Sequence, residues 1–146
     1  MALDDIPVVV TMPDANPLTG NAPAVLNELG AMLAALAERG ETGVIDLGGL
    51  PLSPADKDWL AARLGRGEIE MTLSLDGPST VRETAFHGVW WIEHHNEKGI
   101  PTGEFIEVNR VPELVPAHPE DIRAAAGKLG LLIDDLDQVF SGVPGT

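Results

Sequence analysis

Two adjacent tryptophans constrain the fold of this chain more than any other feature. Trp90 and Trp91 stand in the stretch ETAFHGVWWIEHHNEKG, residues 83–99, whose aromatic and β-branched residues favour a strand. Successive side chains of a strand point to opposite faces of a sheet. We therefore predict that one ring lies in the core. The other ring is exposed unless a helix or a second subunit covers it.

The remaining hydrophobic periodicity predicts an α+β fold. Apolar residues recur at helical spacing in three segments and at strand spacing in four. Between them these segments predict a mostly antiparallel sheet of about four strands, with three helices packed mainly on one face. Gly88, inside the longest strand, is expected to mark a bend or bulge. The predicted helices are 24–38, 54–64 and 119–136, and the predicted strands are 42–50, 68–75, 80–95 and 103–111.

The composition of successive segments predicts the domain organisation. Residues 1–20 are rich in Pro, Asn and Gly and predict a loose arm with at most one short edge strand. Residues 21–140 are expected to form a single domain, and 141–146 a frayed tail. No apolar run approaches the roughly 20 residues of a membrane span, and no basic segment precedes the first apolar run. The expected location is the cytoplasm.

Composition excludes several functional classes. The 146 residues contain no cysteine, which removes disulfides and thiolate chemistry. The formal net charge is −14, from 23 acidic and 9 basic residues. An acidic surface of this kind repels phosphate backbones and anionic lipid, so neither nucleic acid nor a membrane is an expected partner. It attracts basic protein segments and confers solubility.

The histidines of the stretch do not predict a metal centre. His94 and His95 are neighbours on a predicted strand, so a regular strand points them to opposite faces. Glu93 and His95 share a face, and Glu107 across the hairpin would complete only a weak set of three ligands. We expect no metal and no cofactor. A metal carrier that uses these histidines and carboxylates remains the first alternative function.

Catalytic motifs are also not evident. The sequence contains no Gly-x-Ser-x-Gly elbow, dinucleotide fingerprint or phosphate-binding loop. Paired carboxylates are numerous, as a chain this acidic makes inevitable. We therefore predict that the protein is not an enzyme and has no catalytic residues. A hydrolase-like enzyme with an unrecognised carboxylate site remains the second alternative, which a closed pocket with a paired, strongly shifted carboxylate would favour.

The tryptophan strand is instead expected to bind another protein. An exposed large ring on a sheet is a typical interface anchor. We predict Trp90 or Trp91 as the anchor, with an acidic rim around it on the outward faces of the two neighbouring strands. The same argument predicts a homodimer, because the modest helices are not expected to cover both faces of the sheet. The predicted rim consists of Glu83, Glu93, Glu104 and Glu107.

Three longer segments resemble a known family. They are LPLSPADKDWLAARLGRGE, the RETAF and GVWW run, and VPELVPAHPEDI. Together with the final amphipathic helix they are similar to hydrogenase expression and maturation proteins of the HupH/HyaF type, from about Leu26 to Leu136. This resemblance implies an accessory protein of membrane-bound, uptake-type nickel-iron hydrogenases. The family offers no established catalytic or metal-binding residues for comparison.

The resemblance also implies a partner. Such proteins are thought to act as chaperones or scaffolds that bind the small-subunit precursor before export, with further maturation proteins as additional partners. That precursor carries a twin-arginine leader with a basic start, which suits an acidic helper. This chain departs from the family in two respects. It has one copy of a unit that is doubled in longer members, and Val111 stands where many members have cysteine.

Overall fold

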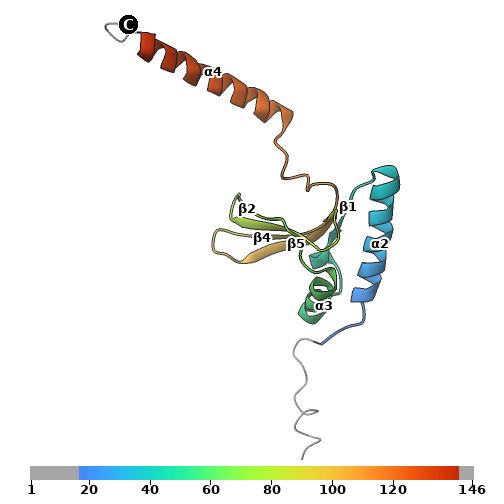
Figure 1. The fold of residues 1–146 in the computed structure, drawn as a ribbon. Helices are drawn as coiled ribbons and strands as arrows, with labels where there is room; N and C mark the ends of the chain where they lie inside the picture. The colour runs from blue at the N-terminus through green and yellow to red at the C-terminus, as the bar shows by residue number, and fades with distance from the viewer. Residues whose placement is uncertain (1–16, 142–146) are drawn as a thin grey trace, which may run out of the picture. The chain divides into compact units, whose positions relative to one another are not determined.

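The structure is a computed structural model that describes residues 17–141. The chain divides into two compact units, residues 1–112 and 113–146, which are drawn in Figure 1. The edge strand predicted within 1–20 and nearly all of the tail predicted at 141–146 lie outside the described residues. The single domain predicted over 21–140 stays a prediction.

The described part of the first unit contains two α-helices; α3 begins where the sequence predicts, and α2 begins two residues earlier than predicted. Helix α2 spans Ala22–Arg39 and ends at Gly40, whose φ of 69° is the left-handed conformation that glycine adopts most easily. Helix α3 spans Pro54–Leu64. Ser53 caps α3 in a full capping box, because its side chain accepts from the backbone N–H of Asp56 while the Asp56 carboxylate accepts from the backbone N–H of Ser53.

The sheet has five antiparallel strands in the order β1-β5-β4-β3-β2. Every hydrogen-bonded neighbour pair is antiparallel, so the predicted fold class is confirmed. A short 3-10 helix, η2 (Leu47–Gly49), follows the first strand. The strands are β1 (Gly43–Asp46), β2 (Glu70–Ser74), β3 (Pro78–Glu83), β4 (Val89–His95) and β5 (Pro101–Val108).

The structure has five strands where the sequence predicted about four, and the additional strand arises at Gly88. The run 80–95 is not one bent strand but two strands, β3 and β4, which pair with each other. Gly88 has a φ of 94°, and the backbone N–H of Thr84 donates to the carbonyl of Val89 at 3.0 Å. The chain therefore reverses between Thr84 and Val89. Our expectation of a mere bend underestimated the turn that a positive φ permits.

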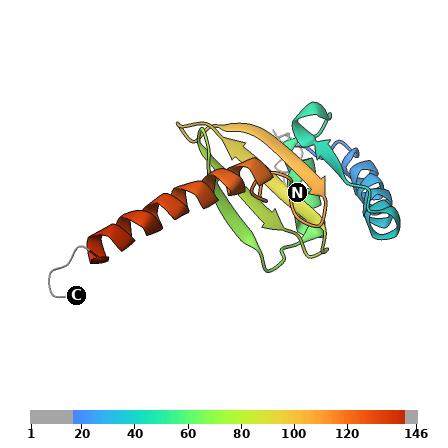
Figure 2. The same cartoon turned by 90° about the horizontal axis from the view of Figure 1, so that it is seen from above.

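This reversal also changes which side chains share a face. One core cluster joins Val89 and Trp91 to apolar residues of α2, α3, β1 and β5. A second cluster, on the other face, joins Val81, Trp90 and Ile92 to partly buried residues of β2 and β5. An uninterrupted strand over 80–95 would place Val81 on the face of Trp91, because alternate residues share a face. The reversal places Val81 with Trp90 instead. Figure 2 shows the strands from above.

The second unit contains helix α4, which spans Pro119–Ser141. It begins where the sequence predicts and continues five residues beyond the predicted end at Leu136. None of its residues is buried. No helix within residues 17–141 is long and apolar enough to cross a membrane.

A buried carboxylate ties the start of the described chain to α3. Asp56 has no exposed surface, and it accepts hydrogen bonds from the backbone N–H groups of Thr19, at 3.0 Å, and Ser53, at 2.9 Å. The Thr19 hydroxyl donates to it as well. The hydrogen bond from the Thr19 side chain is the main cause of a lowered pKa at Asp56, and the bonds from Ser53 and the Thr19 backbone act in the same direction against burial.

We predict that Asp56→Asn lowers the melting temperature at pH 7 and that this loss shrinks in acid. A carboxyl whose pKa is lower in the folded state stabilises the fold above its unfolded value, here 3.8. That contribution disappears as the pH falls through the folded-state pKa. Thermal unfolding of both proteins between pH 7 and pH 3 tests this. An equal loss at both pH values would mean that the lost contacts are purely structural.

Candidate interaction surfaces

The structure distributes the six predicted partner-binding residues over both faces of the sheet. The strand register aligns Glu83 with Trp90, and Trp90 with Glu107, in one row across β3, β4 and β5. Glu93 is aligned with Glu104 in a different row. Because faces alternate along β4, Trp91, Glu93 and Glu104 share the face that α2 and α3 cover. The six residues therefore form two groups and not one ring with an acidic rim.

The first group centres on Trp91, which is 3% exposed. Its indole N–H donates to Glu104 Oε2 at 2.9 Å, and the guanidinium of Arg82 lies 5.1 Å from the ring centroid. The other carboxylate oxygen of Glu104 lies 3.3 Å from Lys57 Nζ on α3. Glu104 thus connects the buried ring to the helix. These contacts give Trp91 and Glu104 a structural role in addition to any role in binding.

Two carboxylates meet beside this ring. Burial raises the pKa of the Glu93 carboxyl above its ordinary value, and its hydrogen bond with Glu104 and the charge of Glu104 raise it further. His95 and Arg82 lower it by smaller amounts. We call these two side chains the carboxylate pair. The pair can share one proton, because two carboxylates in hydrogen-bond contact resist double ionisation.

The carboxylate pair lines a cleft of about 380 Å³ at the edge of the helix-covered face. Both carboxylates keep part of their surface exposed, so water and a partner side chain can reach them. Lys57 supplies the one basic group in the lining. The other lining residues are Gly48, Pro101, Thr102 and Gly103.

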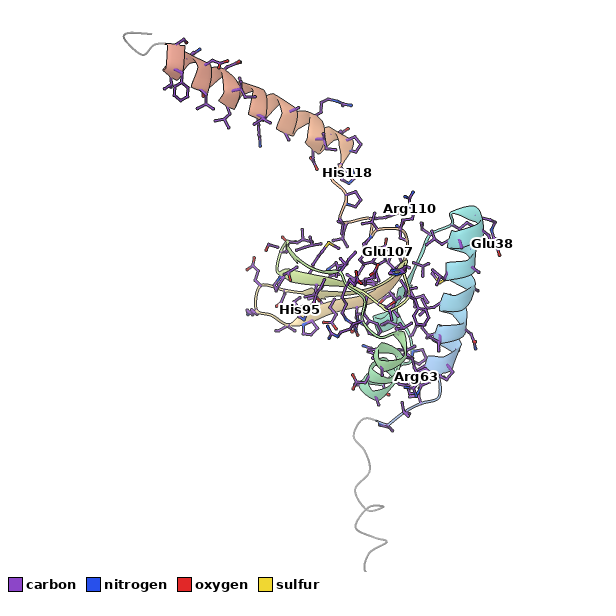
Figure 3. All side chains as sticks on the ribbon, in the orientation of Figure 1. Glu38, Arg63, His95, Glu107, Arg110 and His118 are labelled. Carbon is purple, nitrogen blue, oxygen red and sulfur yellow. The ribbon has the colours of Figure 1, made fainter. Side chains whose placement is uncertain are left out.

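The second group centres on Trp90, which is also 3% exposed. Its indole N–H donates to the carbonyl of Asn109 at 3.0 Å, and the Asn109 side-chain amide donates to Glu107 at 3.0 Å. His87 lies 3.4 Å from Glu83. Glu83 and Glu107 are 7% and 6% exposed. They flank Trp90 in the register of the sheet, and Figure 3 labels Glu107 among the side chains of the first unit.

The expectation of one exposed tryptophan is therefore wrong. β4 is buried on both faces, and each indole N–H has an acceptor on or directly after β5. The argument for a homodimer through a leftover tryptophan fails for the same reason. That the two tryptophans and four glutamates bind a partner stays a prediction. Among the four glutamates, only Glu93 and Glu104 are not buried.

The histidines do not assemble the ligand set that the metal-carrier alternative needs. His94 shares a hydrogen bond with the Ser79 hydroxyl at 2.7 Å and meets Phe105 edge-on. A bulge separates His94 from His95. Glu107 lies toward the other end of the sheet from His95 (Figure 3). Within residues 17–141 no group of three or more histidine and carboxylate side chains could hold a metal ion.

An apolar groove that our sequence reasoning missed lies beside α2. It measures about 370 Å³. Phe86, which is half exposed, stands at this groove because the reversal after Thr84 places it in a loop. Only recognition of that reversal could have predicted the groove, since the sequence placed Phe86 inside the strand predicted at 80–95. The lining residues are Leu26, Leu29, Gly30, Leu33, Arg63, Leu64, Phe86 and Val89.

Comparison with known proteins identifies the class of this α+β chain. Residues 19–136 match the family described as HupH hydrogenase expression protein, C-terminal conserved region. The match covers most of the chain and crosses the boundary between the two units. The chain belongs to this family, and the resemblance predicted from its sequence motifs is confirmed.

Individual relatives support the assignment. The chain is 32% identical over 111 residues to hydrogenase expression/formation protein HoxQ of Azotobacter vinelandii. This alignment covers 75% of this chain and 39% of the relative. It is 33% identical over 85 residues to hydrogenase-1 operon protein HyaF of Escherichia coli strain K12, covering 58% and 30%. The chain thus spans about two fifths or less of the length of these curated relatives.

A solved structure resembles the fold. The hydrogenase expression protein HupH from Thiobacillus denitrificans is 50% identical and superimposes with a TM-score of 0.78. The alignment covers 82% of this chain and 99% of that one. HoxQ and HupH are named as hydrogenase expression or formation proteins, and HyaF as a hydrogenase-1 operon protein.

We predict that the carboxylate pair makes the protein less stable as the pH rises. A glutamate whose pKa is raised in the folded state favours the fold below its ordinary value, 4.5. That contribution declines as the pH rises through the folded-state pKa. Glu93→Gln removes the titration, so wild type should lose melting temperature relative to this variant between pH 4.5 and pH 7.

The control for this prediction is Glu97→Gln. Glu97 is exposed in the turn between β4 and β5, so the substitution removes an equal charge away from the carboxylate pair. Thermal unfolding of the three proteins across the pH range is the measurement. A pH-independent difference between wild type and Glu93→Gln would contradict a raised pKa at Glu93.

Proposed function

We propose that this chain is a non-enzymatic assembly factor that binds the small-subunit precursor of an uptake nickel-iron hydrogenase in the cytoplasm, before export. The observation that carries the proposal is the match of residues 19–136 to the conserved region of hydrogenase expression proteins. The names of the relatives, which refer to hydrogenase expression and formation, support a role in maturation. The nickel-iron class and the small subunit are what the sequence resemblance implies.

The carboxylate pair is the contact we assign to the basic leader of that precursor. A guanidinium donates two parallel hydrogen bonds to carboxylate oxygens, a geometry that a lysine cannot reproduce. Glu93 and Glu104 are aligned across the hairpin and open to a cleft that a side chain could enter. An arriving arginine would replace the shared proton as the group that relieves their repulsion. Binding should therefore release a proton near the pKa of Glu93.

The same pair is the feature that most favours the enzyme alternative, since paired carboxylates of raised pKa serve as general acids and bases. Enclosure is the second requirement that we set for a catalytic site. Glu93 and Glu104 both remain partly exposed. Glu104 is also engaged by Lys57 and Trp91. A contact with a charged partner accounts for this arrangement better than proton transfer to a sequestered substrate does.

We predict that the precursor is captured through its leader and the carboxylate pair. The protein is immobilised in extracts of cells that express the hydrogenase operon, with the leader present or deleted. Deletion should abolish capture, and Glu93→Gln should weaken it roughly tenfold, the cost of one charge-assisted hydrogen bond. Glu97→Gln should leave capture unchanged. Capture that is independent of the leader would contradict the assigned contact, and no capture of any hydrogenase subunit would contradict the function.

We also predict that association with the precursor slows as salt rises. The net charge of −14 attracts a basic leader over long distances. At about 0.15 M salt the Debye length is about 8 Å, so added salt screens this attraction further. Association rates by surface-based binding at low and high ionic strength are the measurement. An unchanged rate would exclude electrostatic steering and leave short-range contacts as the basis of recognition.

A further inference from the structure

Helix α4 carries a continuous apolar face along its whole length. Its apolar residues recur at three positions of every seven, the pattern of a helix that packs against a partner. All seven large side chains on this face are at least 47% exposed. If Ile122 is written as position a of a heptad, the a, d and e positions are Ile122, Ala125, Ala126, Leu129, Leu132, Ile133, Leu136, Val139 and Phe140.

The helix also needs packing to be stable. Gly127 and Gly130 lie outside the apolar face, and glycine in a helix interior is less favourable than alanine. Most helical stability in proteins comes from burial of the apolar face and not from intrinsic propensity. A partner must therefore cover the a, d and e positions for α4 to persist in water.

The two edges of the apolar face differ in a way that selects the partner. At one edge the g positions carry charges of alternating sign, on Asp121, Lys128 and Asp135. At the other edge the e positions are apolar. In an antiparallel pair of identical helices, g positions face g positions and e positions face e positions. In a parallel pair, each g position faces an e position.

We propose that α4 is a dimerisation helix that pairs antiparallel with α4 of a second copy of this chain. Opposed residues at the a and d positions then have numbers that sum to 261. We call the a and d positions, along which the two helices meet, the seam. Three kinds of layer fill it, each occurring twice: Ile122 against Val139, Ala125 against Leu136, and Leu129 against Leu132. Each small residue thus meets a large one, which is the arrangement that fills a core without voids.

Charge supports the antiparallel orientation. On one edge, Lys128 of each chain approaches Asp135 of the other, which gives two symmetric ion pairs. On the opposite edge, Ala126 of each chain approaches Ile133 of the other. A parallel pair would instead place Lys128 against Ile133 and Asp135 against Phe140. The sequence of α4 is therefore complementary to itself in one direction only.

The length of α4 suits a moderate interface. Its 23 residues correspond to about 34 Å at 1.5 Å per residue, and a contact strip about 10 Å wide gives a footprint of roughly 340 Å² per helix. Specific complexes bury about 800 Å² of accessible surface per partner. The footprint of the helix pair is less than half of that value, so we expect a weak dimer with a dissociation constant near the micromolar level.

The main test compares two neighbouring leucines that differ only in their face. Leu132 lies on the seam, whereas Leu131 points away from it and is even more exposed, at 68% against 54%. In sedimentation velocity the wild-type chain should reach twice its mass of 15.4 kDa. Leu132→Asp should weaken the dimer at least a hundredfold, because two carboxylates would be buried, and Leu131→Asp should not. A wild-type monomer at all concentrations, or equal effects of both variants, would overturn the proposal.

Charge reversal tests the two ion pairs. Lys128→Asp and Asp135→Lys should each raise the dissociation constant roughly tenfold, since each creates two like-charge contacts. The double variant swaps the positive and negative charges between the two positions, so each ion pair can form again. Its dissociation constant should therefore return close to that of the wild type. Rescue distinguishes a direct contact from a general effect of net charge. Additive losses in the double variant would rule out the Lys128–Asp135 contact and the antiparallel register with it.

Disulfide trapping tests the direction, because the chain has no native cysteine. When Ile122→Cys and Val139→Cys are mixed, the antiparallel pair predicts a mixed disulfide and few disulfides between identical chains. Asp134→Cys, on the polar face, is the control that should remain uncross-linked. Disulfides between identical Ile122→Cys chains would indicate a parallel pair and contradict the proposal. Absence of any disulfide between the Ile122→Cys and Val139→Cys chains would also contradict it.

Discussion

Burial of β4 on both faces is the constraint on which the first unit depends. Four consecutive residues from Val89 to Ile92 are buried, and β4 is the middle strand of the five. One face requires α2 and α3, which supply most of the larger core cluster. The other face requires Met71, Leu73 and Phe105 from the strands themselves. A strand with a tryptophan on each side can be stable only where both layers exist.

The polar groups that this burial encloses explain several contacts that look functional in isolation. Both indole N–H groups need acceptors, and they find them in Glu104 and in the carbonyl of Asn109. Within residues 17–141 no buried side-chain nitrogen or oxygen lacks a hydrogen-bond partner. Glu104 is thus an acceptor for the core and a member of the carboxylate pair, which couples the chemistry of the cleft to the position of Trp91.

The sequence predicted the fold well wherever one periodicity ran without interruption. The helix predicted at 54–64 and the strand predicted at 68–75 each depend on local periodicity, and the structure has them as α3 (Pro54–Leu64) and β2 (Glu70–Ser74). Prediction failed at Gly88, because a glycine of positive φ can either bend a strand or reverse the chain, and only the pairing of β3 with β4 decides between them. That one residue moved Val81 to the other face and Phe86 into a loop.

Less of the candidate site could be predicted, for a related reason. Alternation correctly placed the two tryptophans on opposite faces, but it could not say what covers each face, since burial is a property of the neighbours. The row of Glu83, Trp90 and Glu107 required the register between three strands. The pairing of Glu93 with Glu104 required the register of one hairpin. Such registers depend on turn geometry and on packing across the sheet.

The two proposed contacts are of opposite electrostatic character. A basic leader is attracted by the net charge of −14, so salt opposes that encounter. A second copy carries the same charge and is repelled at long range, so salt favours that association by screening the repulsion. The Lys128–Asp135 pairs oppose this trend only weakly, because exposed ion pairs contribute little. Short-range burial along α4 must therefore overcome the repulsion, which is why the apolar seam carries the dimer and the ion pairs mainly set its direction.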